Sequence, residues 1–213
     1  MGLKKMLPRA FRMAYCYTKC DRISTDEQIS RDQKLKSIYR MEESWLGDLG
    51  KMFKGNGLMD AALAVGMKDM ERIYTTLESP DDALRFAEVV LSHFPQILVN
   101  RPDDKTMFQS YIFAIYYKGK AYAQKGMVKE CEKEFDTVNI KLNDGIQEDP
   151  SNPKLQNLYR YLTKQIFYDY IDIAKTYPEL KQTAYRTCYS QLKTFDQRDP
   201  GNEQIQDYIG RFK

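Results

Sequence analysis

Histidine and cysteine are scarce in this chain of 213 residues, which has one histidine and four cysteines. The single histidine, His93, excludes metal sites built from two or more histidines and leaves a serine or cysteine nucleophile with one possible imidazole base. Only Cys16 and Cys20 are close in sequence, and no second pair completes a zinc set. We therefore expect reduced thiols in an intracellular protein, with no metal and no other cofactor.

Long apolar runs and catalytic motifs are also missing. The longest unbroken apolar run, Tyr111 to Tyr117, is far shorter than the roughly 20 residues of a membrane span. There is no N-glycosylation sequon and no secretory signal, so neither a transmembrane segment nor secretion is expected. The glycine spacing from Gly50 to Gly55 is not followed by the lysine and hydroxyl of a phosphate loop. We assign no catalytic residue and expect a protein that is not an enzyme.

Charge of either sign is nearly balanced, because 33 basic residues face 30 acidic ones and the net charge is +3. This composition does not indicate a nucleic-acid-binding protein. The exception is an N-terminal arm, residues 1–23, whose first twenty residues contain no acid. An arm of this kind is typical of a mitochondrial presequence, and equally of a basic tail that packs on the protein or on an acidic neighbour, so cytoplasmic and mitochondrial locations both stay open. Its basic residues are Lys4, Lys5, Arg9, Arg12 and Lys19.

Helical signals dominate the rest of the chain. Apolar residues recur at intervals of three and four, as in the stretch from Leu155 to Tyr177, and no stretch alternates long enough to form a strand. The segment Ser79 to Asp82 combines an N-cap, a proline at the first helical position and two acids in the first turn. The sequence predicts an all-α fold of about eight to nine helices and no sheet.

The stretch 107–138 predicts two helices joined at Gly126, and its register resembles the tetratricopeptide repeat, a helix-turn-helix unit of about 34 residues. Lys118, Val138 and Asn143 depart from the repeat pattern, and the missing proline at 143 predicts that the second helix continues toward Glu148. Six positions match the family's pattern. The large, small, aromatic, turn-glycine, small and aromatic positions of the repeat are occupied, in that order, by Ile115, Gly119, Tyr122, Gly126, Cys131 and Phe135. Partial matches recur before Pro95 (Met67, Met70, Tyr74, Ala83, Val90) and before Pro200 (Cys188, Leu192, Phe195).

The resemblance implies a superhelix of tetratricopeptide-like hairpins that occupies residues 24–213 as a single domain. Its hairpins would lie near 58–95, 107–148 and 154–200, with a short last helix at 202–213. In this family the first helices of successive repeats line a groove that binds a peptide or a partner helix. Carried over by register, the groove would be lined by Phe113, Tyr116, Tyr117, Lys120, Gln124, Tyr168, Asp172 and Lys175.

These groove residues leave two interpretations open. Aromatic anchors with a few charges suit protein recognition, but the same tyrosines also suit packing between repeats. Our first hypothesis for function is a non-catalytic interaction or structural subunit of a larger multiprotein assembly, in the cytoplasm or the mitochondrion. The alternatives are a soluble adaptor that binds peptides, and an accessory protein that binds RNA or an anionic membrane surface through the basic arm.

Overall fold

The computed structural model describes residues 105–212 without interruption and, before them, Ser30, Gln33 and residues 79–85, 87–88 and 91–92. The basic arm, His93 and most of the hairpin expected at 58–95 lie outside the described residues. The chain divides into two compact units, Met1–Ala114 and Ile115–Lys213. That a single domain occupies residues 24–213 stays a prediction.

The described part of the first unit is helical. Residues 80–85, 87–88 and 91–92 have helical structure, and the carbonyl of Ser79 accepts the N–H of Ala83 at 3.0 Å. Pro80 stands at the first helical position, where its missing N–H costs no hydrogen bond. Ala83 and Ala87 lie one turn apart and are both buried, so this side of the helix is its packing face. Helix α7 (Lys105–Gln124) begins in the first unit and ends in the second.

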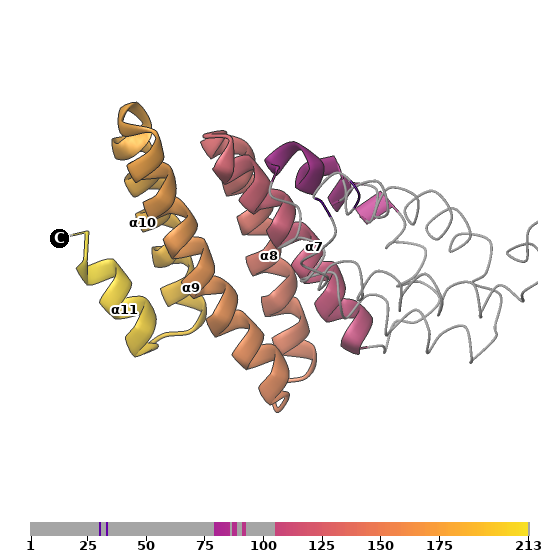
Figure 1. The fold of residues 1–213 in the computed structure, drawn as a ribbon. Helices are drawn as coiled ribbons and strands as arrows, with labels where there is room; N and C mark the ends of the chain where they lie inside the picture. Colours follow the sequence, from indigo (N-terminus) through magenta and orange to yellow (C-terminus); the bar gives the residue numbers. More distant parts are fainter. Residues whose placement is uncertain are drawn as a thin grey trace, which may run out of the picture. The chain divides into compact units, whose positions relative to one another are not determined.

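The second unit consists of consecutive helices joined by short turns (Figure 1). After α7 come α8 (Val128–Glu148), α9 (Pro153–Thr176), the 3-10 turn η3 (Pro178–Leu180), α10 (Lys181–Arg198) and α11 (Glu203–Gly210). The described residues contain helices and no strand, which confirms the all-α prediction for this part of the chain. None of these described helices combines the length and the hydrophobicity that a membrane span requires.

The turn between α7 and α8 depends on Gly126, whose φ is +71°. The N–H of Met127 donates to the carbonyl of Tyr122 and the N–H of Gly126 to that of Ala123, both at 3.0 Å, which is the Schellman arrangement. A side chain at Gly126 would also lie 3.2 Å from the ring of Tyr177. Glycine is therefore required both by the backbone conformation and by the close approach.

The turns before α9 and α11 have the same chemistry, although they are 50 residues apart in sequence. In each, an Asp-Pro-x-Asn segment ends one helix and its asparagine caps the next. The side-chain oxygen of Asn152 accepts the N–H of Lys154 at 3.1 Å, and that of Asn202 accepts the N–H of Gln204 at 3.1 Å. Both asparagines also donate through their amide nitrogen to the aspartate three residues earlier. The repeated turn gives two successive helix pairs the same kind of connection.

The core of the second unit forms where α7 and α8 approach closely at Gly119. A β-carbon on Gly119 would lie 2.6 Å from the ring of Phe135, so no larger residue fits without a shift. The Phe135 ring is fully buried and lies between the rings of Tyr116 and Tyr170, at centroid distances of 5.9 and 5.7 Å. A column of aromatic rings thus joins α7, α8 and α9.

Candidate functional site

Two of the expected groove residues, Tyr116 and Tyr117, lie in the core. They are 2% and 8% exposed, and the Tyr116 hydroxyl donates to Oδ2 of Asp169 at 2.9 Å. A hydroxyl satisfied in this way inside the protein has no free hydrogen bond to offer a peptide. For these two side chains, packing between helices is the interpretation that agrees with their burial.

The remaining groove residues differ in burial and in their partners. Lys120 is half-buried, with its ammonium 3.9 Å from Oδ1 of Asp169. Asp172 and Lys175 are exposed and form an ion pair at 3.6 Å within one turn of α9. Phe113 is half-buried and belongs to the first unit, Gln124 is exposed with its carbonyl accepting the Tyr177 hydroxyl, and Tyr168 is 40% exposed.

Tyr168 and Lys175 instead share a second surface, a cleft of about 680 Å³ between the second half of α9, the first half of α10 and the residues after α11. We call it the C-terminal pocket and define it by Tyr168, Lys175, Tyr185, Arg186, Tyr189 and Phe212. The pocket exists because α11 has 8 residues, whereas α9 has 24 and α10 has 18. The short helix covers part of the α9–α10 surface and leaves the rest open.

Aromatic rings form the apolar part of the C-terminal pocket, and Phe212 is at their centre. Its ring lies edge-on to Phe167 on α9 at 5.9 Å and to Tyr185 and Tyr189 on α10 at 5.5 and 6.3 Å. Phe167 is buried, whereas Tyr185, Tyr189 and Phe212 are each half-buried. The rings therefore hold one another in place while part of each still faces water.

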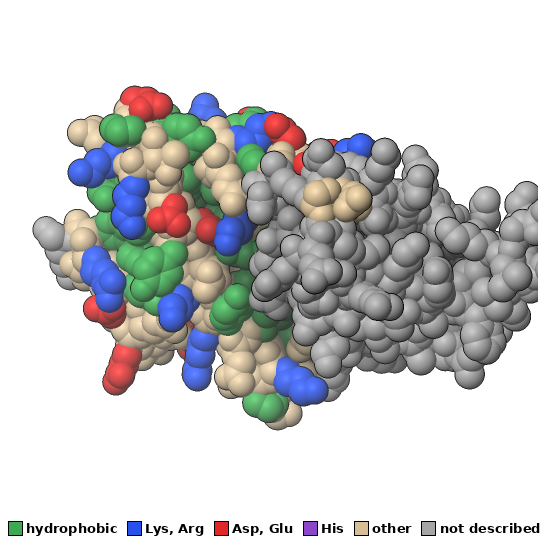
Figure 2. Space-filling view, in the orientation of Figure 1, with side chains coloured by type: hydrophobic (Ala, Val, Ile, Leu, Met, Phe, Trp, Pro, Cys, Tyr) green, Lys and Arg blue, Asp and Glu red, His purple; other side chains and the backbone are tan. Residues whose placement is uncertain are grey.

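Cations surround these rings. The residues that line the C-terminal pocket include Lys175, Arg186 and Arg211 and no carboxylate. Arg211 pairs with Asp207 at 2.7 Å and Lys175 with Asp172 at 3.6 Å, while Arg186 is exposed and forms no ion pair within the described part of the chain. Figure 2 shows hydrophobic patches with both basic and acidic side chains among them on the C-terminal side of the molecule. The pocket therefore combines an apolar floor with a positively charged rim.

A separate network surrounds the carboxylate of Asp169, which is 8% exposed. Burial raises its pKa from the ordinary value of 3.8 to about 6, although the ammonium of Lys120 and the hydroxyl of Tyr116 favour the charged form. Burial likewise raises the pKa of Tyr116 well above its usual range. Asp169 does not line the C-terminal pocket, and both of its named partners are part of the packing between α7 and α9. We interpret this network as structural.

The buried thiols lack the character of nucleophiles. Cys131 and Cys188 are free, fully buried and next to the hydroxyl of Tyr170. Burial raises the pKa of Cys131 to about 12 and that of Cys188 above its usual range, so both are neutral thiols near pH 7. Within residues 105–212 and the shorter described segments, no group of three or more His, Cys, Asp or Glu side chains could hold a metal ion.

Sequence reasoning missed Asp169 and the α10 side of the C-terminal pocket. Asp169 carried a usable signal, since it stands three residues after Ile166 and four before Ile173 on the apolar stripe of α9. Tyr185 and Tyr189 also share one helix face, at a spacing of four, but their exposure depends on where α11 ends. Nothing in the local sequence of α10 indicates that end point.

Comparison of the chain with protein-family models, with curated proteins and with solved structures gave no match. The functional argument therefore rests on the geometry of the C-terminal pocket and on the fold that forms it.

Proposed function

We propose that this protein is a non-catalytic subunit of a larger assembly, built from tetratricopeptide-like hairpins, and that it docks a partner protein at the C-terminal pocket. The observation that carries the proposal is the cluster of half-buried rings left open beside α11. Clustered apolar surface of this kind is typical of protein interfaces, where aromatic and arginine side chains contribute most of the binding energy.

The hairpin architecture supports the same proposal. Gly119 allows α7 and α8 to approach closely, and the two Asp-Pro-x-Asn turns connect successive helix pairs in the same way. In a stack of hairpins each unit buries the face of the one before it, so the last face needs a cap. Helix α11 covers only part of this face, and a docked partner would cover the open cleft beside it.

The basic arm offers no independent support for an RNA-binding or membrane-binding function, because all of its residues lie outside the described part of the chain. The proposed docking role holds for either compartment, cytoplasm or mitochondrion. A reversible peptide adaptor would use the same surface with shorter-lived complexes.

The test is co-purification of the tagged full chain from its native cells, with the bound proteins quantified by mass spectrometry. Tyr189→Ala removes a ring from the C-terminal pocket, and Tyr161→Ala is the matched control, since Tyr161 is a 42% exposed tyrosine of α9 that does not line the pocket. We expect a stoichiometric partner with the wild type and the control, and its loss with Tyr189→Ala. Identical partners for all three chains, or a stable lone monomer, would refute the proposal.

A further inference from the structure

We infer that the partner at the C-terminal pocket is an acidic amphipathic helix that inserts one large apolar side chain between the rings and places carboxylates against the cationic rim. This inference rests on the proposed docking function and specifies its chemistry. Three observations lead to it: the charge of the lining, the way α11 already uses the neighbouring surface, and the arrangement of the rings.

The charge of the lining favours an acidic partner. Lys175, Arg186 and Arg211 line the pocket and no carboxylate does, although Asp172 and Asp207, just outside the lining, pair with Lys175 and Arg211. Two further cations lie over its rings, because the ammonium groups of Lys181 and Lys193 are each 5.8 Å from a tyrosine centroid. The planar guanidinium of Arg186, which has no ion-pair partner within the described residues, suits a carboxylate in a two-point contact.

Helix α11 shows that an amphipathic helix packs on the surface next to the pocket. Its apolar side, formed by Ile205, Tyr208 and Ile209, is buried, and the Tyr208 ring stacks on Phe167 of α9 at 4.2 Å. Its other side carries an acid, Asp207, which holds Arg211 at the edge of the C-terminal pocket. An acidic amphipathic helix of this chain thus covers one part of the α9–α10 surface, and the pocket begins where that helix ends.

Two other occupants are less well matched. The chain's own arm, residues 1–23, is basic and would be repelled by the rim. A single-stranded nucleic acid would meet cations and rings, but Phe212 lies edge-on to its three neighbours, so it does not form with them a row of parallel rings on which successive bases could stack. A pocket of edge-on rings accepts an inserted side chain more readily.

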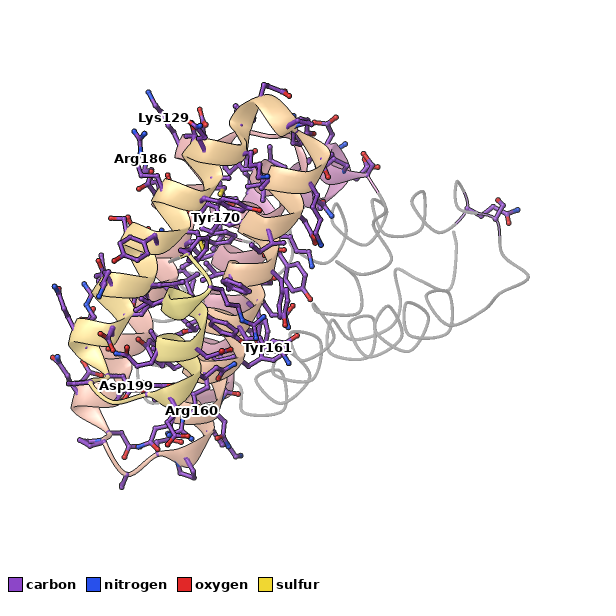
Figure 3. All side chains as sticks on the ribbon, turned by 90° about the vertical axis from the view of Figure 1, so that its left-hand side faces the viewer. Lys129, Arg160, Tyr161, Tyr170, Arg186 and Asp199 are labelled. Carbon is purple, nitrogen blue, oxygen red and sulfur yellow. The ribbon has the colours of Figure 1, made fainter. Side chains whose placement is uncertain are left out.

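The experiment selects binders from a display library of random peptides about four helical turns long, with the intact chain as bait. Selected peptides are then measured against Arg186→Glu and against its matched control, Arg160→Glu. Both arginines are exposed, and they project at opposite ends of the helices in Figure 3. Thermal unfolding of both variants confirms that neither substitution disturbs the fold.

We expect selected peptides to combine acidic residues with a large apolar one, and to bind Arg186→Glu about tenfold more weakly or worse, while Arg160→Glu binds them as the wild type does. If the selected peptides are neutral or basic and do not bind Tyr189→Ala, the inference of an acidic partner is wrong, but the proposed docking function stands. If the selected peptides bind Tyr189→Ala as tightly as they bind the wild type, both the acidic partner and docking at this pocket are wrong. This inference is also overturned if no peptide is selected. It is overturned as well if a labelled single-stranded oligonucleotide binds the wild type and not Arg186→Glu. The co-purification experiment tests the docking function separately.

Discussion

Replacing the buried carboxylate of Asp169 by asparagine should change the pH dependence of stability. In the unfolded chain this carboxyl has its ordinary pKa of 3.8, whereas burial raises the pKa to about 6 in the folded protein. Between these values the folded state holds the proton more tightly than the unfolded state. The contribution of Asp169 to stability is therefore greatest below about pH 4 and is lost as the pH rises through 6.

The size of the effect follows from the shift itself. One unit of pKa corresponds to about 1.4 kcal/mol, so the rise from 3.8 to about 6 lowers the free energy of unfolding by about 3 kcal/mol at neutral pH, relative to pH 4 or below. Asparagine has nearly the same shape, can still accept the Tyr116 hydroxyl and carries no charge to desolvate. The attraction between Lys120 and the carboxylate is already included in the pKa of about 6. Any loss that does not depend on ionisation, such as a change in packing, is the same at every pH and cancels in the comparison.

The assay is urea unfolding of wild type, Asp169→Asn and Asp144→Asn from about pH 4 to pH 8. The advantage of Asp169→Asn over wild type should grow by about 2–3 kcal/mol across this range, because the unfolded carboxyl is already partly ionised at pH 4. Asp144 is an exposed aspartate of α8, and Asp144→Asn serves as the control for removing one carboxylate. If the stability difference for Asp169→Asn stays constant with pH, the carboxylate is not held at a raised pKa and the argument from burial is wrong.

Other substitutions test the turns and the core. Gly119→Ala should lower the unfolding free energy by about 1–3 kcal/mol, because its β-carbon meets the facing ring, while Gly210→Ala, with open space around it, should be neutral or stabilising by up to about 1 kcal/mol. Asn202→Ala should cost about 1 kcal/mol through loss of the α11 cap, measured by urea unfolding, and an unchanged midpoint would contradict the capping role. Cys131 and Cys188 should resist a thiol reagent in the native protein and react on unfolding, and rapid native labelling of either would contradict their burial.

Local chemistry made the helices of residues 105–212 predictable. The Gly126 turn, the Asp-Pro-x-Asn segments and Pro178 each act on their own few residues, so the sequence alone places the helix ends. The absence of proline at 143 correctly predicted that α8 continues to Glu148. The close approach at Gly119 also agrees with its small-residue position in the repeat register.

Burial and exposure of individual rings were less predictable, because they depend on which helices meet. The repeat register placed both Tyr116 and Tyr168 in the expected groove lining, yet the first is 2% exposed and the second 40%. The difference arises because a full-length helix, α9, covers Tyr116, whereas the short α11 covers the region of Tyr168 incompletely. How far α11 extends over α9 depends on tertiary packing, and the apolar periodicity of α9 does not predict it.

The distribution of exposed apolar groups separates the C-terminal pocket from the rest of the surface. Ile140 and Tyr161 are 46% and 42% exposed and do not line the pocket, and single exposed apolar residues of this kind are normal in folded proteins. In the pocket, by contrast, Tyr185, Tyr189 and Phe212 are each held by ring contacts and still face water together. Burial of apolar area stabilises a protein by about 25 cal/mol for each Å². The protein lacks this stabilisation wherever the three rings stay in contact with water. The docking that we propose would recover that energy by covering these rings.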